Sequence, residues 1–185
     1  GVGYYGPRAD GEITENEPPG QDFMARVAVE WEASTAALAD DGVRVAIIRT
    51  GLVCCTAGGV LPLMALPYRF YVGGRLGTGR QWIPWIHIDD EVRAIRFLID
   101  HATACGPFNL SAPNPVTDQE FAITLGRVLG RPSWLHVPAP ALRLALGEMS
   151  TLVLEGQKAI PTRLLAEGFS FRFPLLEPAL HDLWA

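Results

Sequence analysis

The sequence predicts an α/β protein built around a parallel β-sheet. Residues 43–53 (VRVAIIRTGLV) are almost continuously apolar and rich in β-branched side chains, a pattern typical of a strand buried on both faces of such a sheet. A stretch with helically spaced apolar side chains precedes this run, and Gly42 separates the two, so that they form half of a βαβ unit. Hydrophobic residues make up 49% of the 185 residues and charged ones 19%, so the chain can bury a core.

The first forty residues are expected to hold a strand end, a loop and one helix. Residues 1–6 (GVGYYG) look like the end of a buried strand that enters a loop, and because no initiator Met precedes them we expect an upstream segment. Residues 7–20 are polar and rich in Pro and Gly, as surface loops are. Asp22 can cap a helix over residues 23–39.

The rest of the chain is predicted to alternate short strands with helices. A change in the length of the strands near residue 112 predicts two parts, residues 1–112 and residues 113–185. The expected elements are a short helix over 60–66 that Pro67 stops, a glycine-rich loop with short strands over 72–88, a helix from Asp89 to His101, a strand over 108–111, a helix from the capping-box residue Thr117 to Gly130, a strand over 134–137, helices over 142–154 and 161–168, a half-exposed strand over 169–173 and a final helix over 175–184.

Composition excludes several classes of protein. The net charge of −5 and the scattered basic residues argue against a nucleic-acid surface. Charges or prolines interrupt every apolar run, so no segment is predicted to span a membrane. Cys54, Cys55 and Cys105 have neither disulfide nor metal spacing, and we expect them to be small buried hydrophobic residues in a reducing cytoplasm.

Three segments resemble, in order, motifs of the extended short-chain dehydrogenase/reductases. Residues 2–6 (VGYYG) resemble the end of the strand that precedes the catalytic helix, residues 49–53 (RTGLV) the strand end against the nicotinamide, and residues 85–94 (WIHIDDEVRA) the motif beneath the substrate pocket. GRQWIPWIHIDD, GPFNLSAPNPVT, LGRVLGRP and LEGQKAIP resemble one atypical subfamily, the nucleoside-diphosphate-sugar epimerase-like proteins. The resemblance implies the C-terminal part of a doubly wound (Rossmann-like) parallel sheet with a small α/β substrate-side subdomain.

The resemblance also implies a nicotinamide cofactor, NADP or NAD, and a small-molecule substrate such as a nucleotide sugar. The Gly-rich phosphate turn of the superfamily is absent from the sequence, so this chain alone is expected to bind the cofactor weakly or not at all. An apolar strand edge left open by a missing first half favours a homodimer or aggregation. The residues implied are Thr50, Gly51, Leu52 and Val53 at the nicotinamide end, and Arg80, Gln81 and Trp82 on the substrate side.

The Tyr and Lys that transfer protons in active relatives have no counterpart in this chain. The resemblance puts Val27 at the Tyr position and Trp31 at the Lys position, and neither can carry a proton. We expect Trp31 to be buried against the strand that holds RTGLV, with Glu32 a solvated charge beside it. Ile83 occupies the position of a diphosphate-clamping Arg, so a nucleotide-sugar substrate does not follow from the motif.

Tyr4, Tyr5 and His87 are the remaining candidates for acid–base chemistry, and each has a structural alternative. The tyrosines can line a pocket with their hydroxyl groups hydrogen-bonded. His87 lies between two isoleucines and before a capping Asp, which favours a buried histidine bonded to the backbone. Two functions stay open: an NAD(P)-dependent epimerase or oxidoreductase, and a cofactor-binding sensor or interaction protein without turnover. A structural fragment without ligand is a third interpretation of this chain alone.

Overall fold

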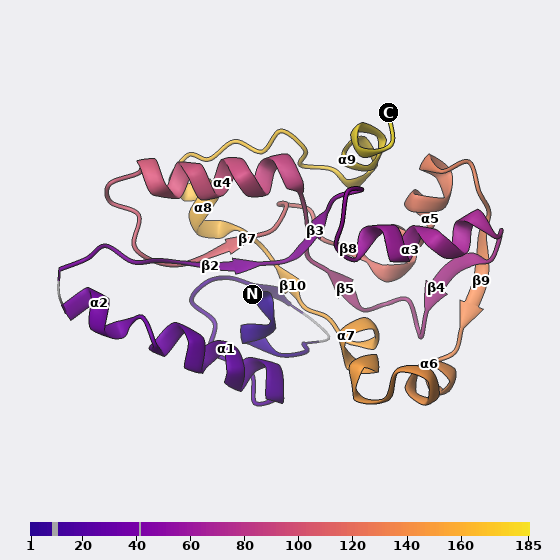
Figure 1. The fold of residues 1–185 in the computed structure, drawn as a ribbon, viewed down its shortest axis with the longest axis horizontal. Coiled ribbons are helices and arrows are strands. Elements are labelled where there is room, and N and C mark those ends of the chain that lie inside the picture. The colour runs from indigo at the N-terminus through magenta and orange to yellow at the C-terminus, as the bar shows by residue number, and fades with distance from the viewer. Residues whose placement is uncertain (9–10, 41) are drawn as a thin grey trace.

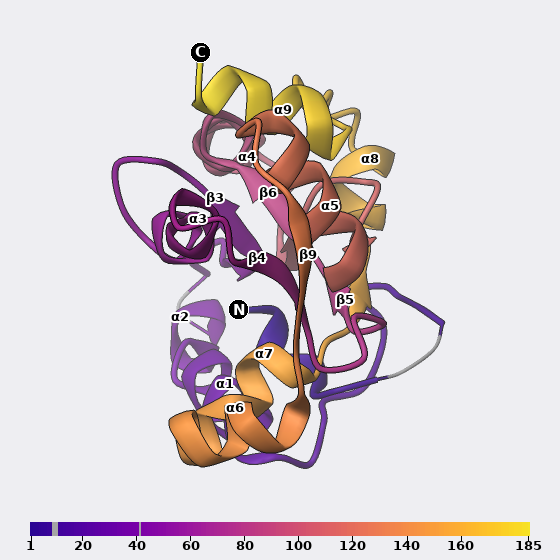
Figure 2. The same ribbon diagram turned by 90° about the vertical axis from the view of Figure 1, so that its right-hand side faces the viewer.

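A computed structural model describes residues 1–8, 11–40 and 42–185. Helices lie on both faces of a central group of parallel strands (Figure 1), and a view from the side shows the same layers (Figure 2). This arrangement confirms the predicted α/β class. The strands are β1 (Glu12–Ile13), β2 (Ala46–Thr50), β3 (Leu52–Cys54), β4 (Gly73–Leu76), β5 (Trp82–Ile83), β6 (Trp85–His87), β7 (Gly106–Leu110), β8 (Val116–Thr117), β9 (Ser133–Val137) and β10 (Lys158–Ala159). The helices are α1 (Phe23–Ala33), α2 (Ala36–Asp40), α3 (Leu61–Arg69), α4 (Ile88–Asp100), α5 (Asp118–Val128), α6 (Ala139–Leu146), α7 (Thr151–Leu154), α8 (Thr162–Ala166) and α9 (Leu176–Leu183), with 3-10 turns η1 (Val2–Tyr5) and η2 (Gly147–Ser150).

The pair of β2 and β7 forms the centre of the layered part. The two strands run parallel along their whole length, with α1 on one face and α4 on the other (Figure 1). Successive side chains of a strand point to opposite faces. Arg49 therefore reaches α1, whereas Thr50 reaches α4. These two residues connect the central strand to both covering helices.

The other strand pairs bring distant parts of the chain together. β3 pairs with β6, β4 with β9, and β1 with β10, all in parallel, whereas β5 and β8 are antiparallel. The pairs β4–β9 and β1–β10 join strands from opposite sides of residue 112. The division of the chain at that residue stays a prediction.

Two hydrophobic clusters form the core. The first surrounds the fully buried Trp85 and contains Leu61 of α3, Phe121 of α5 and Leu180 of α9. The second surrounds Phe108 of β7 and includes side chains from α4 and α8. The first cluster supports the β3–β6 pair and the second supports the β2–β7 pair.

Helix starts with side-chain caps agree with the sequence. The Asp22 carboxylate accepts from the Ala25 amide at 3.0 Å, at the start of α1. Thr117 and Glu120 form the predicted capping box of α5, in which Glu120 Oε2 accepts from the Thr117 amide at 2.8 Å. Such caps satisfy amides that have no partner within the helix.

Several predicted elements are interrupted. The run 43–53 contains two strands separated at Gly51, and Ile48 is 39% exposed, so burial on both faces is wrong there. The helix predicted over 23–39 breaks after Ala33, where the hydroxyl groups of Ser34 and Thr35 donate to backbone carbonyls of the preceding turn. Gly147, at φ 58°, caps the end of α6 and begins η2 within the predicted helix over 142–154.

Other expectations are wrong in the kind of structure they assign. Residues 2–5 form a 3-10 turn in place of a strand end, and Pro67 lies inside α3 instead of stopping it. Of the predicted loop over 7–20, residues 12–13 form β1, and residues 9 and 10 lie outside the described residues. By contrast, the short strands predicted within residues 72–88 are confirmed: Gly73 and Gly74 belong to one of them, β4, where a side chain at Gly74 would collide with the backbone of β9. No strand forms over 169–173.

The described part of the chain has neither a candidate membrane span nor a candidate metal-binding group. None of its helices is long and apolar enough to cross a bilayer. None of its His, Cys, Asp and Glu side chains form a group of three or more that could bind a metal ion. All three cysteines are free, but Cys105 is exposed, so the expectation of burial is wrong for that residue.

The buried carboxyl group of Asp118 is expected to make the free energy of unfolding depend on pH. It is 4% exposed, its carboxylate accepts from the Leu76 amide at 2.8 Å, and burial raises its pKa from 3.8 to about 6. The folded state thus binds this proton more tightly than the unfolded state, so the stability it adds is full below pH 3.8 and is lost as pH rises through about 6. Asp118→Asn keeps an acceptor for Leu76 and does not titrate.

We expect Asp118→Asn to gain stability relative to the wild type between pH 4 and pH 7, by on the order of 1–3 kcal/mol. Urea unfolding midpoints over this range measure the difference, which cancels the contributions of other titrating groups. A difference that is constant with pH would contradict the assignment.

Candidate functional site

Gly51 lies where the chain exchanges one neighbouring strand for another. Its amide donates to Leu110 at the end of β7, at 2.9 Å, and the next amide, of Leu52, donates to Pro84 beside β6, at 2.6 Å. A side chain at Gly51 would collide with the Pro84 carbonyl oxygen. The carboxyl ends of parallel strands, where neighbours change, are the usual ligand edge of an α/β sheet. Of the predicted cofactor residues, Thr50 and Gly51 lie at this edge, and Leu52 and Val53 are the first residues of β3.

A buried cluster around Arg49 lies beside this edge. The guanidinium donates to both carboxylate oxygens of Glu32, at 2.8 and 2.7 Å, and to the Tyr5 hydroxyl at 2.9 Å. It also lies over the Tyr4 ring, 3.4 Å from its centre. The Tyr5 hydroxyl donates in turn to Asn109 Oδ1 at 2.6 Å. We call these five residues the Arg49 cluster.

The Arg49 cluster is extended by Glu15. Its Oε1 accepts from the backbone amides of Asn109, at 3.0 Å, and Arg163, at 3.3 Å. The Asn109 side chain donates to the Ile160 carbonyl at 2.9 Å. Six separate segments of the chain, including β2 and β7 themselves, therefore meet in one polar network.

Burial and hydrogen bonding in the cluster keep both Tyr5 and Arg49 protonated. Burial raises the pKa of Tyr5, although the hydrogen bond from Arg49 opposes this. Burial disfavours the charge of Arg49, but its hydrogen bonds with Glu32 and Tyr5 hold its pKa above the ordinary value. At neutral pH, Tyr5 is a neutral phenol and Arg49 is a cation.

Thr50 and Glu91 form a second polar contact at the same edge. The Thr50 hydroxyl donates to Glu91 Oε1 at 2.9 Å, and Glu91 is 6% exposed in the first turn of α4. Burial raises the pKa of Glu91, and the hydrogen bond from Thr50 opposes this shift. Of the other predicted cofactor residues, Leu52 and Val53 pack in part against the two core clusters.

The predicted substrate residues have different surroundings. The Gln81 amide donates to the carbonyls of Leu76 and Val153, at 2.9 and 3.0 Å, and so connects β4 to α7. Trp82 lies in β5 beneath the Lys158 ammonium, which is 4.9 Å from the ring centre. Arg80 is exposed in the turn before β5. Gln81 therefore connects two elements of the fold through its side-chain hydrogen bonds.

His87 has the surroundings of a structural histidine. Its Nδ1 accepts from the Asp89 amide at 3.1 Å, and its ring lies 4.0 Å from the Phe173 ring. Nε2 is 3.5 Å from Asp182 Oδ2. Burial lowers the pKa of His87, in spite of the nearby carboxylates, which favours the neutral ring.

Trp31 and Glu32 exchange the roles that the sequence predicts. Trp31 is 72% exposed, and Val27 is half-buried, so burial of Trp31 against the strand is wrong. The face of α1 that is buried includes Ala25 and Ala28. Glu32 lies further along this face and pairs with Arg49, so it is not a solvated charge.

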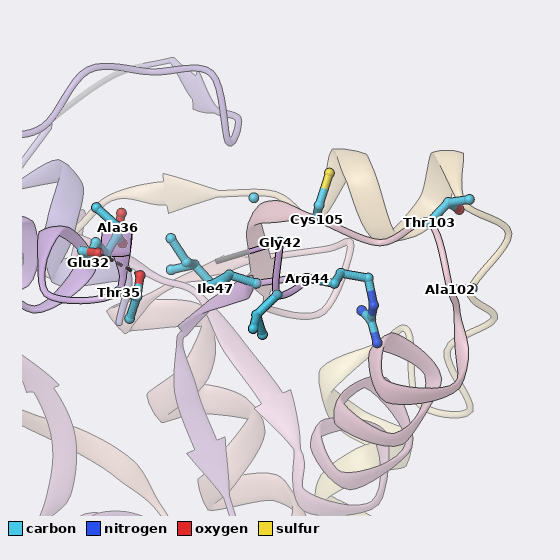
Figure 3. A pocket seen from close by; sticks show the side chains of 12 residues that line it. Glu32, Thr35, Ala36, Gly42, Arg44, Ile47, Ala102, Thr103 and Cys105 are labelled. Carbon is cyan, nitrogen blue, oxygen red and sulfur yellow. Dashed lines mark hydrogen bonds between the residues drawn. The ribbon is translucent and has the colours of Figure 1, made fainter. Parts of the chain in front are cut away.

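A groove lies away from the ligand edge. This groove, of about 650 Å³, runs between the end of α1 and the loop that precedes β7 (Figure 3). Thr35, Arg44 and Cys105 line it, at the amino ends of β2 and β7. The guanidinium of Arg44 is bonded to the carbonyls of Leu98, Ile99 and Ala104. The groove is therefore separate from residues 50–53.

Comparisons with known proteins agree on one group. Residues 137–183 match a family described as a domain of unknown function, DUF1731. An epimerase family protein of Staphylococcus saprophyticus is 48% identical over 185 residues, which cover 98% of this chain and 61% of that protein. The chain thus spans less than two thirds of the length of this relative.

Solved structures give the same result. The human epimerase family protein SDR39U1, in a structure with NADPH, is 36% identical with a TM-score of 0.94, over 99% of this chain and 62% of the human one. A nucleoside-diphosphate sugar epimerase of Corynebacterium glutamicum is 35% identical with a TM-score of 0.81, over 98% of this chain and 36% of that one.

Proposed function

We propose that, in the full-length protein, this chain forms the nicotinamide end and the substrate side of an NAD(P)-dependent site. The chain belongs to the epimerase family of extended short-chain dehydrogenase/reductases, where it corresponds to the C-terminal part. The observation that carries the proposal is the position of residues 50–53. Thr50 lies at the carboxyl end of β2 beside the end of β7, and Gly51 lets the chain pass close to Pro84 into β3, which begins with Leu52 and Val53. The human relative with this fold was solved with NADPH.

The residues present fit a nicotinamide group at this edge. Thr50 supplies a hydroxyl group, and Leu52 and Val53 supply apolar side chains that pack in part against the two core clusters. Glu91 supplies a buried carboxyl group whose Oε2 has no hydrogen-bond partner among the described residues. The bound cofactor would supply hydride transfer at a carbinol carbon of the substrate. Arg80 and Trp82 then lie toward the substrate side, and NADP is the form present in the human relative.

Few side chains at this site could transfer a proton to or from the substrate. The family resemblance puts Val27 and Trp31 at the positions of the proton-transferring pair, and the Tyr5 hydroxyl is hydrogen-bonded to Arg49 and Asn109. Of the two candidate tyrosines, Tyr4 has no hydroxyl hydrogen bond within the described part of the chain, so it is the candidate donor. These features also support the second candidate function, a cofactor-binding sensor or interaction protein without turnover.

One pair of measurements tests the proposal. We expect the full-length protein to bind NADPH or NADH with a micromolar or lower Kd, while this 185-residue chain binds neither at that level, since it has no Gly-rich phosphate turn. Isothermal titration measures both. Oxidation of the bound cofactor with a panel of carbonyl compounds then separates an enzyme from a sensor. No binding by the full-length protein would overturn the proposal.

A further inference from the structure

Glu91 holds a buried carboxylate oxygen that lacks a donor. Its Oε1 accepts from Thr50, but its Oε2 has no hydrogen-bond partner among the residues that the structure describes. The side chain as a whole is 6% exposed. A buried acceptor that is left unpaired costs free energy, so a donor is expected to reach Oε2 in the functional state.

The surroundings of Glu91 indicate which group supplies that donor. Thr50 is the last residue of β2, and Gly51 follows at the ligand edge. In the proposed function, on which this inference rests, the nicotinamide lies against residues 50–53. The carboxamide NH₂ is the hydrogen-bond donor of that ring. We propose that Glu91 Oε2 accepts a hydrogen bond from the nicotinamide carboxamide, and that Thr50 holds the carboxyl group in position.

The charges around Glu91 are consistent with an acceptor. Glu91 lies in the first turn of α4, where the helix dipole favours a negative charge. Arg49, on the opposite face of β2, is paired with Glu32 and so does not reach Glu91. The alternative donor is the protein itself, because the backbone nitrogen of Gly1 lies close enough to Glu91 for an electrostatic interaction.

A cofactor analogue distinguishes these two donors in the full-length protein. The 3-acetylpyridine analogue of NADPH carries a methyl ketone in place of the carboxamide and has no N–H at that position. We expect Glu91→Met to weaken NADPH binding by about 10- to 100-fold in isothermal titration, the loss typical of a hydrogen bond to a charged group. Binding of the analogue should change less than about threefold, since it never made the bond.

Two variants support the comparison. Glu91→Gln keeps an acceptor oxygen and should recover most of the affinity for NADPH. Val92→Met, on the adjacent and 57% exposed position of α4, should leave both affinities unchanged. If Glu91→Met does not fold, Thr50→Val makes the same test, because it removes the group that orients the carboxylate; a selective loss for NADPH is again expected.

The outcomes separate the inference from the function on which it rests. Equal weakening of NADPH and the analogue by Glu91→Met, or no weakening of either, would show that Oε2 bonds to the protein and would overturn the inference alone. Absence of NADPH and NADH binding by the wild type would overturn the proposed function together with the inference.

Discussion

Replacement of Arg49 by alanine is expected to lower the free energy of unfolding by about 3–5 kcal/mol, the cost of breaking a buried ion pair by removing one partner. The Arg49 side chain is 4% exposed and that of Glu32 is 18% exposed. The substitution leaves the Glu32 carboxylate without its two donors and removes a donor from the Tyr5 hydroxyl. Urea denaturation of the 185-residue chain measures the loss.

An exposed ion pair of similar length provides the control. Arg127 and Glu177 approach to 2.8 Å, but their side chains are 59% and 43% exposed. Arg127→Ala should therefore change stability by less than about 1 kcal/mol. Arg49→Ala and Glu32→Ala should also be strongly non-additive when combined, because either one alone strands the other charge. Equal losses for the two arginine variants would contradict a buried structural role for Arg49.

Local signals account for the parts of the fold that the sequence predicts well. Asp22 and the Thr117–Glu120 capping box define helix starts by contacts within four residues. The apolar, β-branched run around residue 47 likewise predicts a parallel strand, because parallel strands are covered by helices. Each of these signals lies within a short stretch of sequence, where periodicity and side-chain chemistry suffice.

Long-range contacts account for most of the wrong expectations. Phe173 and Arg172 were expected in a strand, yet their amides donate to the buried carboxylate of Asp90, which is 83 residues from Phe173. Asp90 itself reads in the sequence as a helix-start residue. No local pattern indicates that its side chain binds a segment near the C-terminus.

The candidate site shows the same limit. Residues 50–53 follow from the family resemblance, but Glu91 and the Arg49 cluster depend on contacts between separate elements. The sequence does hold a signal for Arg49, which is a charged residue within an apolar strand. Burying a charge at such a position costs free energy unless a partner of opposite charge lies beside it. The partner of Arg49 lies 17 residues away on α1, and its identity as Glu32 depends on which face of that helix is buried.

Helix α1 shows how that face can be misassigned. The large side chains of Val27 and Trp31 predict one buried face, whereas the small Ala25 and Ala28 are the buried residues of α1, which packs against η1. Neighbouring positions on a helix differ by about 100°, so an error of one residue exchanges a buried position for an exposed one. Small residues allow a helix to approach its neighbours closely, and hydrophobic periodicity gives them little weight.

The second large expected effect is the loss of stability when Trp85 is replaced by alanine. Trp31 provides the control, because it is the same residue type at the opposite extreme of burial. Trp85 is fully buried in the first core cluster, and its ring nitrogen donates to the Asn114 carbonyl at 3.0 Å. Trp85→Ala should destabilise the 185-residue chain by about 3–5 kcal/mol, since it removes a large side chain and leaves a cavity.

Trp31→Ala should change the stability of the same chain by less than about 0.5 kcal/mol, as expected for a surface position, because its ring is 72% exposed. Urea midpoints of both variants, measured side by side, decide the matter. A large loss for Trp31→Ala would restore the packing role that its helical spacing predicts. A small loss for Trp85→Ala would mean that the β3–β6 pair, and with it the ligand edge at Gly51, does not depend on the first core cluster.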